Sequence, residues 1–318
     1  FFKHLIFIIL VIFVIIFFSS IDQKKLFNLS LVIFFILLAF LFLVPVLGIE
    51  VKGSKRWIDL YLLPRFQPIE LVKPFLIVFV SLILGSQKYS NIYLKYLVTF
   101  LVTSLIAILL VMQPDIGQTI LVFFSWAILI FTSGINIFFL MTLFLIITFL
   151  FLYLIFFVSK FIYIKNRILS FFDSESGTHN FQSDKAIDSI TSGGFFGKGI
   201  GEGTLKNMVP EAHTDYIISV ISEEFGVVAI ILILFLFLIF IHTVFKKVNL
   251  ENEERVKLIL TGCVSLILMQ AMIHIGVNIR LFPTTGMTLP YISYGGSSII
   301  STSILSGIIL NLTRRRIN

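Results

Sequence analysis

Long apolar runs separated by short polar connections make up most of the chain. A helix needs about 20 consecutive apolar residues to cross a bilayer. Nine runs approach that length, and none shows the two-residue alternation of an outer-membrane β-strand. The predicted spans are 4–20, 27–48, 68–86, 93–112, 116–134, 136–159, 216–245, 256–279 and 287–311. The pattern therefore predicts an all-α, polytopic integral membrane protein with a single membrane domain over residues 1–318.

The connections between these runs predict an orientation. If each run crosses once, the short basic connections share one side, namely Asp22–Lys25, Gln87–Lys95, Lys246–Lys257 and Arg314–Arg316. Short loops rich in Lys and Arg stay in the cytoplasm, so this side is predicted to be cytoplasmic. The other side receives the stretch 160–215, which is the only sizeable region outside the bilayer. No separate soluble domain fits into it, so any chemistry is expected there and at the neighbouring turns and helix ends.

Composition supports the membrane assignment. Hydrophobic residues make up 58% of the 318 residues and charged residues 13%, with a mean hydropathy of +1.06. A soluble domain of this size cannot bury so much apolar surface. The formal charge of +7 fits basic cytoplasmic loops and anionic lipids, and no nucleic-acid partner is expected. Basic residues in the outside loops leave two explanations open, attraction to lipid head groups or a site for an anionic substrate such as a pyrophosphate.

Two simple features limit the alternatives. The single cysteine, Cys263, lies in an apolar run, which excludes a disulfide framework and favours a small buried side chain. The sequence begins at Phe1 and enters an apolar run without a cleavage site after it. We therefore interpret the start as a truncation and not as a signal peptide.

A glycine-rich stretch runs from Gly193 to Thr204. Six glycines in eleven residues disfavour a regular helix. The stretch is not a Walker motif, because Gly-Lys-Ser/Thr is absent and no strand precedes it. The glycines instead predict that backbone approaches backbone, or a ligand, at the membrane surface.

A short acidic segment precedes the seventh run. Pro210 suits a helix start, and Asp215 at that start has two interpretations. It is either an ordinary helix cap or a partly buried carboxylate with a pKa raised toward that of a general base. Glu211 and His213 are close enough in sequence to tune it or to help to hold a cation. Their spacing matches no usual zinc motif.

Charged and helix-breaking residues interrupt two other runs. Glu70 and Lys73 lie three residues apart on one face of a predicted helix, and form either a self-neutralising pair or part of a functional site. Prolines, glycines and hydroxyls interrupt the segment 283–298. Non-helical backbone at membrane depth persists only where protein covers it or a wet cavity adjoins it. This segment is therefore predicted to be broken or re-entrant and to face a groove.

Six stretches of the sequence, in this order, resemble motifs of the SEDS family (shape, elongation, division and sporulation). They are GSKRWI at 53–58, FQPIELVK at 66–73, QPDIGQT at 113–119, SGGFFGKGIGEGT at 192–204, PEAHTDYIISVISEEFG at 210–226 and FPTTGMTLPYISYGGSS at 282–298. The FtsW-type division branch is more similar than the RodA-type elongation branch. The family has ten spans, so the resemblance implies that the first is missing here. Two departures are Pro74, expected to kink its helix, and Arg280, where the family tends to have glycine.

The resemblance implies that lipid II is polymerised into glycan strands by a single inverting displacement, with release of undecaprenyl pyrophosphate. Asp215 matches the family's essential loop aspartate and is assigned the role of base. Coordination of a divalent cation, Mg or Mn, is its alternative role, and no other cofactor is expected. Arg56, Lys73 and Arg167 are implied to hold the pyrophosphate, with Glu70 orienting Lys73. The remaining expected substrate-binding residues are Lys198, His213, Ser293 and Ser297.

The resemblance also implies the setting. It places the chain in the bacterial inner membrane at the division septum, with the active site on the outer face. The implied partners are a class B penicillin-binding protein (a transpeptidase) and other division proteins. The rival functions are a lipid II flippase, a RodA-like elongation polymerase and a division scaffold. A flippase needs its charged residues near the midplane and reachable from both sides, whereas here they cluster at the outer face.

Overall fold

The computed structural model describes residues 2–51, 54–60, 64–87, 91–158, 161–172 and 181–314. Parts of the predicted motifs and loops lie outside these residues, namely Gly53 of the motif 53–58, Asp173–His179 of the stretch 160–215, and Arg316. Contacts divide the chain into two compact units. Unit 1 comprises Phe1–Ser133, Ile239–Met269 and Tyr294–Asn318. Unit 2 comprises Gly134–Leu238 and Gln270–Ser293.

Long helices follow all nine predicted spans, so the all-α membrane architecture is confirmed. They are α1 (Phe2–Ser20), α2 (Gln23–Leu47), α3 (Pro68–Leu84), α4 (Ile92–Met112), α5 (Ile116–Thr132), α6 (Ile137–Phe157), α9 (Ile217–Leu250), α10 (Glu254–Asn278) and α11 (Gly296–Thr313). Within the described residues, six of them are long and apolar enough to cross a membrane, and part of α1 and all of α5 are shorter apolar helices. The chain is therefore a multi-pass membrane protein.

Two of the predicted spans differ from the helices found. The last one begins at Gly296 and not at 287, because residues 287–295 follow the irregular path that Pro290 and Gly295 favour. This outcome agrees with the predicted interruption of 283–298. Helix α9 is broken at Gly226, whose φ of 75° and ψ of −175° are not helical. By contrast, α3 continues through Pro74 as one helix from Pro68 to Leu84, so the expected kink does not divide it.

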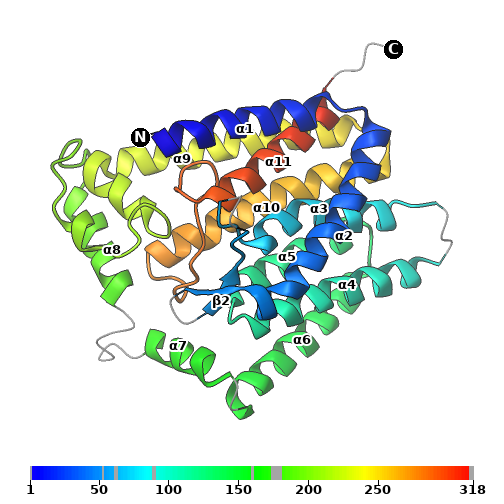
Figure 1. Cartoon of the computed structure of the whole chain (residues 1–318), viewed down its shortest axis with the longest axis horizontal. Helices are drawn as coiled ribbons and strands as arrows, with labels where there is room; N and C mark the ends of the chain where they lie inside the picture. The colour runs from blue at the N-terminus through cyan, green and yellow to red at the C-terminus, as the bar shows by residue number, and fades with distance from the viewer. Residues whose placement is uncertain are drawn as a thin grey trace. The chain divides into compact units, whose positions relative to one another are not determined.

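Unit 1 is built around α3, which is buried along most of its length and packs against α2, α4, α5 and α11. Helix α1 lies along α11 (Figure 1). A side chain at Gly307 would meet the Cβ of Phe18 at 2.6 Å, so glycine permits this close approach. Asn311 then donates to the backbone oxygens of Phe18 and Ser19, at 2.9 and 3.2 Å. These bonds satisfy carbonyls that the end of α1 leaves free.

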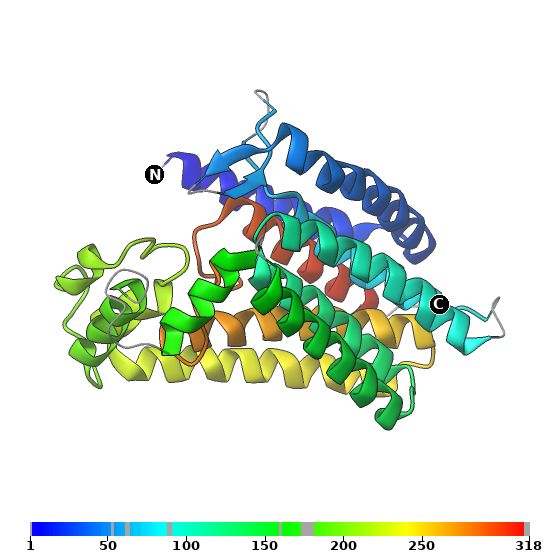
Figure 2. The same cartoon turned by 90° about the horizontal axis from the view of Figure 1, so that it is seen from below.

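A short hairpin in unit 1 follows α2. Strands β1 (Ile49–Val51) and β2 (Ser54–Trp57) pair antiparallel and appear as blue arrows in Figure 2. An isolated bridge between Ile58 and Phe66 continues the pairing toward the start of α3. The hairpin therefore carries Arg56 to the N-terminal end of α3.

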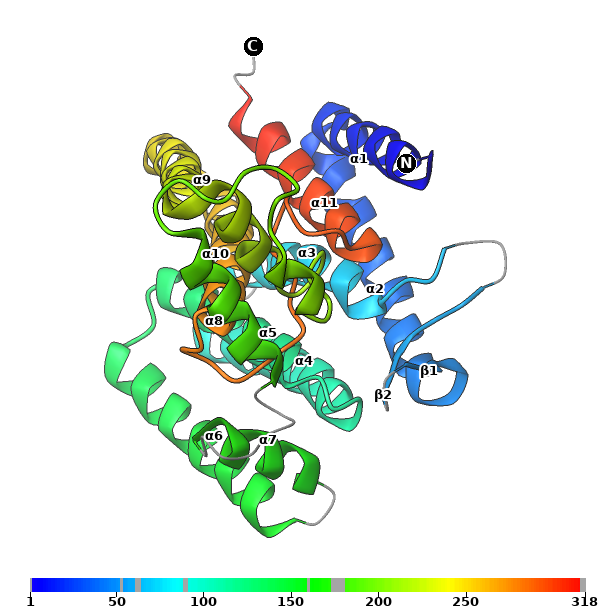
Figure 3. The ribbon, with the colours of Figure 1, turned by 90° about the vertical axis from the view of Figure 1, so that its left-hand side faces the viewer.

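Unit 2 contains the predicted outside stretch 160–215. That stretch forms α7 (Ile162–Phe172), α8 (Phe181–Gly193) and a 3-10 turn, η2 (Leu205–Met208). These short helices were not predicted, because many of their residues are polar and the apolar periodicity along the sequence is weak. Helix α7 lies beside α6 (Figure 3). The core of the unit joins Ile218 of α9, Ala271 of α10 and Leu289 of the irregular segment.

Candidate active site

Asp215 lies in the turn before α9, in unit 2. The amides of Thr214 and Asp215 both lie 3.1 Å from the carbonyl oxygen of Glu211, which curls the chain ahead of Ile217. Glu211 adopts a positive φ of 58° to make this turn. Asp215 is half-buried and His213 is exposed. The turn therefore holds the carboxylate at the head of α9.

Two buried side chains fix the backbone on either side of this residue. The amide Nδ2 of Asn278 donates to the carbonyl oxygen of Asp215 at 3.0 Å and to that of His274 at 2.9 Å. The hydroxyl of Ser293 donates to the carbonyl oxygen of Thr214 at 2.7 Å and accepts the amide of Leu289 at 2.8 Å. Asn278 and Ser293 are 0% and 1% exposed. Because both carbonyls are held from a rigid core, the position of Asp215 is preorganised.

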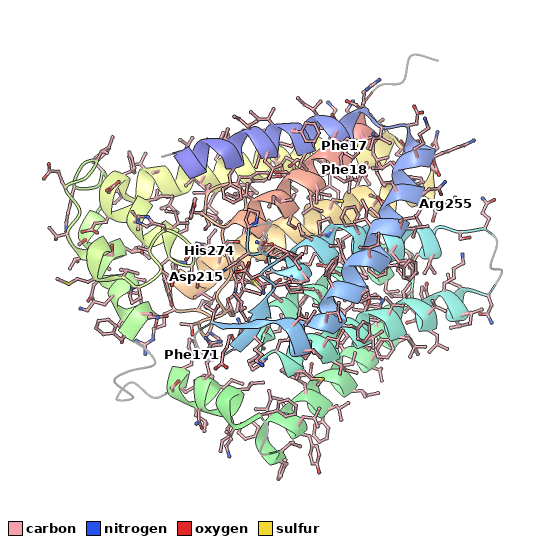
Figure 4. The ribbon with its side chains drawn as sticks, viewed as in Figure 1. Phe17, Phe18, Phe171, Asp215, Arg255 and His274 are labelled. Atoms are coloured by element: carbon pink, nitrogen blue, oxygen red, sulfur yellow. The ribbon has the colours of Figure 1, made fainter. Side chains whose placement is uncertain are left out.

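The end of α10 also fixes the segment that faces the carboxylate. Nδ1 of His274 lies 2.7 Å from the carbonyl oxygen of Met287. A carbonyl only accepts, so Nδ1 must carry the hydrogen. Next to Met287, Gly286 has a φ of 72°, and a Cβ there would lie 3.6 Å from Oδ2 of Asp215. Both His274 and Asp215 are labelled in Figure 4. His274 and Asn278, one turn apart on α10, thus hold the backbone of Met287, next to Gly286, and the backbone of Asp215.

The pKa of Tyr216 depends on burial and on the charges near this turn. Burial raises the pKa of its phenol, the carboxylate of Asp215 raises it further, and the guanidinium of Arg167 lowers it. Tyr216 is therefore neutral, and the charges of both Asp215 and Arg167 of α7 act on it. Among the described residues, the Oη of Tyr216, the Oδ1 of Asn278 and the Nε2 of His274 are buried without a hydrogen-bond partner. Polar groups of this kind suit a polar ligand or an ordered water.

The predicted pair Glu70–Lys73 forms in unit 1. The Nζ of Lys73 lies 2.9 Å from Oε2 of Glu70, and the two side chains are 1% and 6% exposed. Nε2 of Gln118 donates to Oε1 of Glu70 at 2.6 Å. Because Pro74 has no N–H, the carbonyl of Glu70 also loses its usual helical partner. Both charges are thus buried among the helices of unit 1.

A second ionic cluster lies in unit 1, at the N-terminal ends of α3 and α5. Asp115 receives a hydrogen bond of 2.9 Å from Nε2 of Gln67, and its carboxylate lies 3.7 Å from the guanidinium of Arg56. The backbone amide of Gln67 donates to the hydroxyl of Ser297 at 3.0 Å. Burial raises the pKa of Asp115, and Arg56 opposes this rise. The cluster joins the hairpin to α3, α5 and α11.

Lys198 belongs to a third cluster, in unit 2. Its Nζ lies 3.2 Å from Oε1 of Glu223, which is 0% exposed. Glu223 also accepts the hydroxyl of Ser189 and the amide of Leu205, both at 3.0 Å. Lys198 therefore neutralises a buried carboxylate, and any bound phosphate would compete with Glu223 for it.

The predicted site residues are divided between the two units. Unit 1 joins Arg56, Glu70, Lys73 and Ser297 to their polar neighbours, whereas unit 2 holds Arg167, Lys198, His213, Asp215 and Ser293. Sequence reasoning gave no role to Gln67, Asp115, Gln118, His274 and Asn278. These residues could have been found from the sequence as polar side chains within or next to apolar runs, because such side chains need a buried partner.

No group of three or more His, Cys, Asp and Glu side chains among the described residues is arranged to hold a metal ion. A magnesium ion in proteins is commonly held by one or two carboxylates together with substrate phosphates. The donor set around Asp215 therefore fits, at most, a cation that arrives with a phosphorylated substrate.

Comparison with known proteins identifies relatives along the whole chain. The profile of the family described as cell cycle protein, which groups FtsW, RodA and SpoVE, matches residues 1–318. A probable peptidoglycan glycosyltransferase FtsW of Caulobacter vibrioides is 32% identical over 293 residues, covering 88% of this chain and 70% of that protein. A protein of the same description from Geobacter metallireducens is 34% identical over 290 residues, covering 88% and 75%.

Solved structures agree with this assignment. The RodA protein of Thermus thermophilus superimposes with a TM-score of 0.70 at 26% identity, covering 98% of this chain and 87% of RodA. A chain from a study of a peptidoglycan synthase complex that coordinates polymerization and crosslinking has a TM-score of 0.78. The superposition covers 97% of this chain and 87% of that chain. Because the two chains are 24% identical, the likeness shows the shared fold alone. With the helices, the ordered motifs and the full-length profile in agreement, the chain belongs to the FtsW–RodA–SpoVE family of cell cycle proteins.

Proposed function

We propose that this protein is a peptidoglycan glycosyltransferase that polymerises lipid II into glycan strands during septal cell-wall synthesis. The observation that carries the proposal is the half-buried carboxylate of Asp215, whose backbone is held by Asn278 and which faces the unsubstituted Gly286. The relatives described as probable peptidoglycan glycosyltransferases support the substrate class. Their shared description as FtsW supports division over elongation.

The proposed reaction needs a base and a cationic environment. Asp215 takes the proton from the 4-hydroxyl of the acceptor sugar as that oxygen attacks the anomeric carbon of the donor. The bond from that carbon to the pyrophosphate oxygen breaks, and undecaprenyl pyrophosphate leaves with the electron pair. The α-linked donor becomes a β-linked product in one displacement. Positive charge is required to stabilise the leaving pyrophosphate.

Arg167 of α7 is proposed as the pyrophosphate ligand in unit 2 on the family resemblance, and its guanidinium lowers the pKa of Tyr216, the residue after Asp215. The roles of Arg56 and Lys73 rest on the family resemblance, as do those of Lys198, His213, Ser293 and Ser297. Ser293 already binds the backbone of Thr214, so we propose a positioning role for it. In its alternative role, Asp215 would instead hold a magnesium or manganese ion, which would neutralise the charge of the pyrophosphate.

The proposed location is the bacterial inner membrane at the septum, with Asp215 on the outer face. The basic connections on the opposite side support this orientation. The proposed partner is a class B penicillin-binding protein, in line with the similar fold in a complex that coordinates polymerization and crosslinking. Other division proteins are proposed as further partners.

Reconstitution tests the proposed function directly. The purified full-length protein, with a class B penicillin-binding partner, is given labelled lipid II in proteoliposomes. We expect β-linked glycan strands and stoichiometric release of undecaprenyl pyrophosphate. Movement of lipid II across the bilayer without polymer would instead identify a flippase. If the protein neither polymerises nor moves lipid II although its partner is functional, the scaffold function is favoured.

Asn278→Ala tests the support of the proposed base. Since Nδ2 of Asn278 holds the carbonyl of Asp215, its removal loosens the carboxylate, and a displacement of about 1 Å costs about 100-fold in rate. We expect kcat for polymerisation to fall by about that factor, with KM nearly unchanged. Steady-state kinetics with labelled lipid II measure both constants.

Gln270→Ala is the matched control for this substitution. Gln270 is also buried on α10 and donates to the same irregular segment, at the carbonyl oxygen of Thr288, 3.1 Å away. This bond reaches Thr288 of the irregular segment, so its loss is expected to alter stability more than kcat. Equal losses of kcat in the two variants would contradict the positioning role of Asn278.

A further inference from the structure

The glycine-rich loop of unit 2 exposes large apolar side chains. Phe195, Phe196 and Ile200 are 76%, 84% and 78% exposed, and we call these three residues the apolar tip. All three lie within six residues of one loop, and exposed groups of large apolar residues usually mark a surface that binds a partner or a membrane. Nothing in the reaction proposed for Asp215 uses them.

The loop is bound rigidly to α9 at the break around Gly226. The amides of Val227 and Val228 donate to the carbonyls of Gly194 and Phe195, at 3.0 and 3.3 Å. In return, the amides of Lys198 and Gly199 donate to the helix carbonyls of Glu223 and Glu224, at 2.9 and 3.1 Å. The break therefore exchanges helical hydrogen bonds for bonds to the loop, and the loop is fixed to the helix at this level.

Glycine is needed at both sides of this junction. A Cβ at Gly226 would lie 2.2 Å from the carbonyl oxygen of Phe195, and one at Gly197 would lie 2.2 Å from that of Glu224. Both glycines also have positive φ, at 75° and 76°. The tip is thus held by a close backbone contact and is not a loosely tethered loop.

The break coincides with the edge of the apolar part of α9. From Val227 to Phe245 the helix is almost wholly apolar, and at 1.5 Å per residue this run is about 28 Å long. That length matches the roughly 30 Å hydrocarbon core of a bilayer. Before Gly226 come the buried Glu223 and the polar Ser222 and Glu224. Gly226 therefore lies where the hydrocarbon begins, and the tip bonded to it lies at the same depth.

The tip also continues the lipid-facing surface of this helix. Val227 and Val228, whose amides bind the loop, are 38% and 49% exposed, and Ile231 and Phe235 farther along are 60% and 56% exposed. Aromatic residues are favoured at the boundary between head groups and acyl chains. A lipid surface is thus the occupant that the position, chemistry and continuity of the tip favour.

We propose that Phe195, Phe196 and Ile200 form an anchor embedded in the bilayer leaflet on the Asp215 side. The anchor fixes the depth of the Glu223 cluster and of the first part of α9. This segment, Ile217–Phe225, is about 14 Å long at 1.5 Å per residue and begins two residues after Asp215. The inference concerns depth in the membrane and holds whether or not Asp215 is the base.

Depth-dependent quenching in lipid nanodiscs tests the anchor. The full-length Phe196→Cys protein is labelled with an environment-sensitive fluorophore, and the wild type is the labelling blank because its single cysteine, Cys263, is buried. Glu202→Cys, exposed on the same loop, is the aqueous control, and Phe235→Cys is the hydrocarbon control. We expect nitroxide lipids labelled near the head group to quench the label at position 196 severalfold more than that at position 202. Aqueous iodide should quench position 202 and spare position 196.

Two outcomes would overturn the proposal. One is a label at position 196 that iodide reaches as readily as it reaches position 202. The other is protection of position 196 only after a second membrane protein is added, which would identify the tip as a protein-binding surface. Phe195→Cys repeats the measurement at the neighbouring tip residue, so that poor folding of one variant does not decide the result.

Discussion

Asp215→Asn is expected to lower kcat for glycan-strand formation by about 100- to 10,000-fold, the usual contribution of a positioned general base. An amide of the same shape cannot accept the proton of the acceptor hydroxyl. The backbone of Asp215 should stay in place, because Asn278 holds the carbonyl and not the carboxylate. Binding of lipid II should therefore be retained. The measurement is polymer formed per enzyme in proteoliposomes, beside a lipid II binding assay.

Two companion variants separate chemistry from folding. Glu211→Gln changes another carboxylate of the same turn, and it is expected to leave most of kcat intact. Its carbonyl, which binds the amides of Thr214 and Asp215, is unaffected. Asp215→Glu restores a carboxylate at a displaced position and should recover part of the activity. Wild-type polymerisation by Asp215→Asn would remove Asp215 from the role of base.

Lys73→Met is expected to lower the free energy of unfolding by about 3–5 kcal/mol, the usual cost of leaving one buried charge without its partner. Glu70 is 6% exposed in its side chain and would then keep an uncompensated carboxylate inside the helices. Gln118 alone cannot balance that charge, since its amide is neutral. Thermal unfolding of the purified protein in detergent measures the loss as a lower midpoint.

A double variant and an exposed pair provide the controls. Glu70→Gln with Lys73→Met removes both charges, and most of the lost stability should return. Lys185→Met breaks the pair Lys185–Asp188, which has the same three-residue spacing and the same distance of 2.9 Å but lies at the surface. Its expected cost is below about 1 kcal/mol. If the double variant is as unstable as Lys73→Met, the charges themselves are not the cause.

The positions of the helices followed from sequence because each long apolar run has only one stable environment. A run such as 93–112 must satisfy its own backbone inside lipid, and a helix does so with local hydrogen bonds. The helix α4 found at Ile92–Met112 confirms this reasoning. The same logic marked 283–298 as irregular, because prolines and glycines interrupt its local hydrogen bonds. The short helices α7 and α8 escaped prediction, since their faces depend on neighbours that the local pattern does not reveal.

The partners of individual polar residues did not follow from sequence. Glu70 and Lys73 could be paired from their spacing along one helix, whereas the link from Gln118 to Glu70 joins residues 48 positions apart. Lys198 was expected at a phosphate, and it lies against Glu223, 25 residues away. Such contacts depend on how helices pack, which the local chain does not specify.

The same limit applies to Asp215. The sequence by itself determined a multi-pass helical chain, the family and the aspartate at the start of its seventh span, because apolar length and ordered motifs are properties of the chain alone. The tertiary structure decided what holds that aspartate. Asn278, Ser293, His274 and Gly286 come from distant segments, and only folding brings them to the turn before α9. The break at Gly226 was likewise decided by tertiary contact, because the glycine loop replaces the helical hydrogen bonds that are lost there.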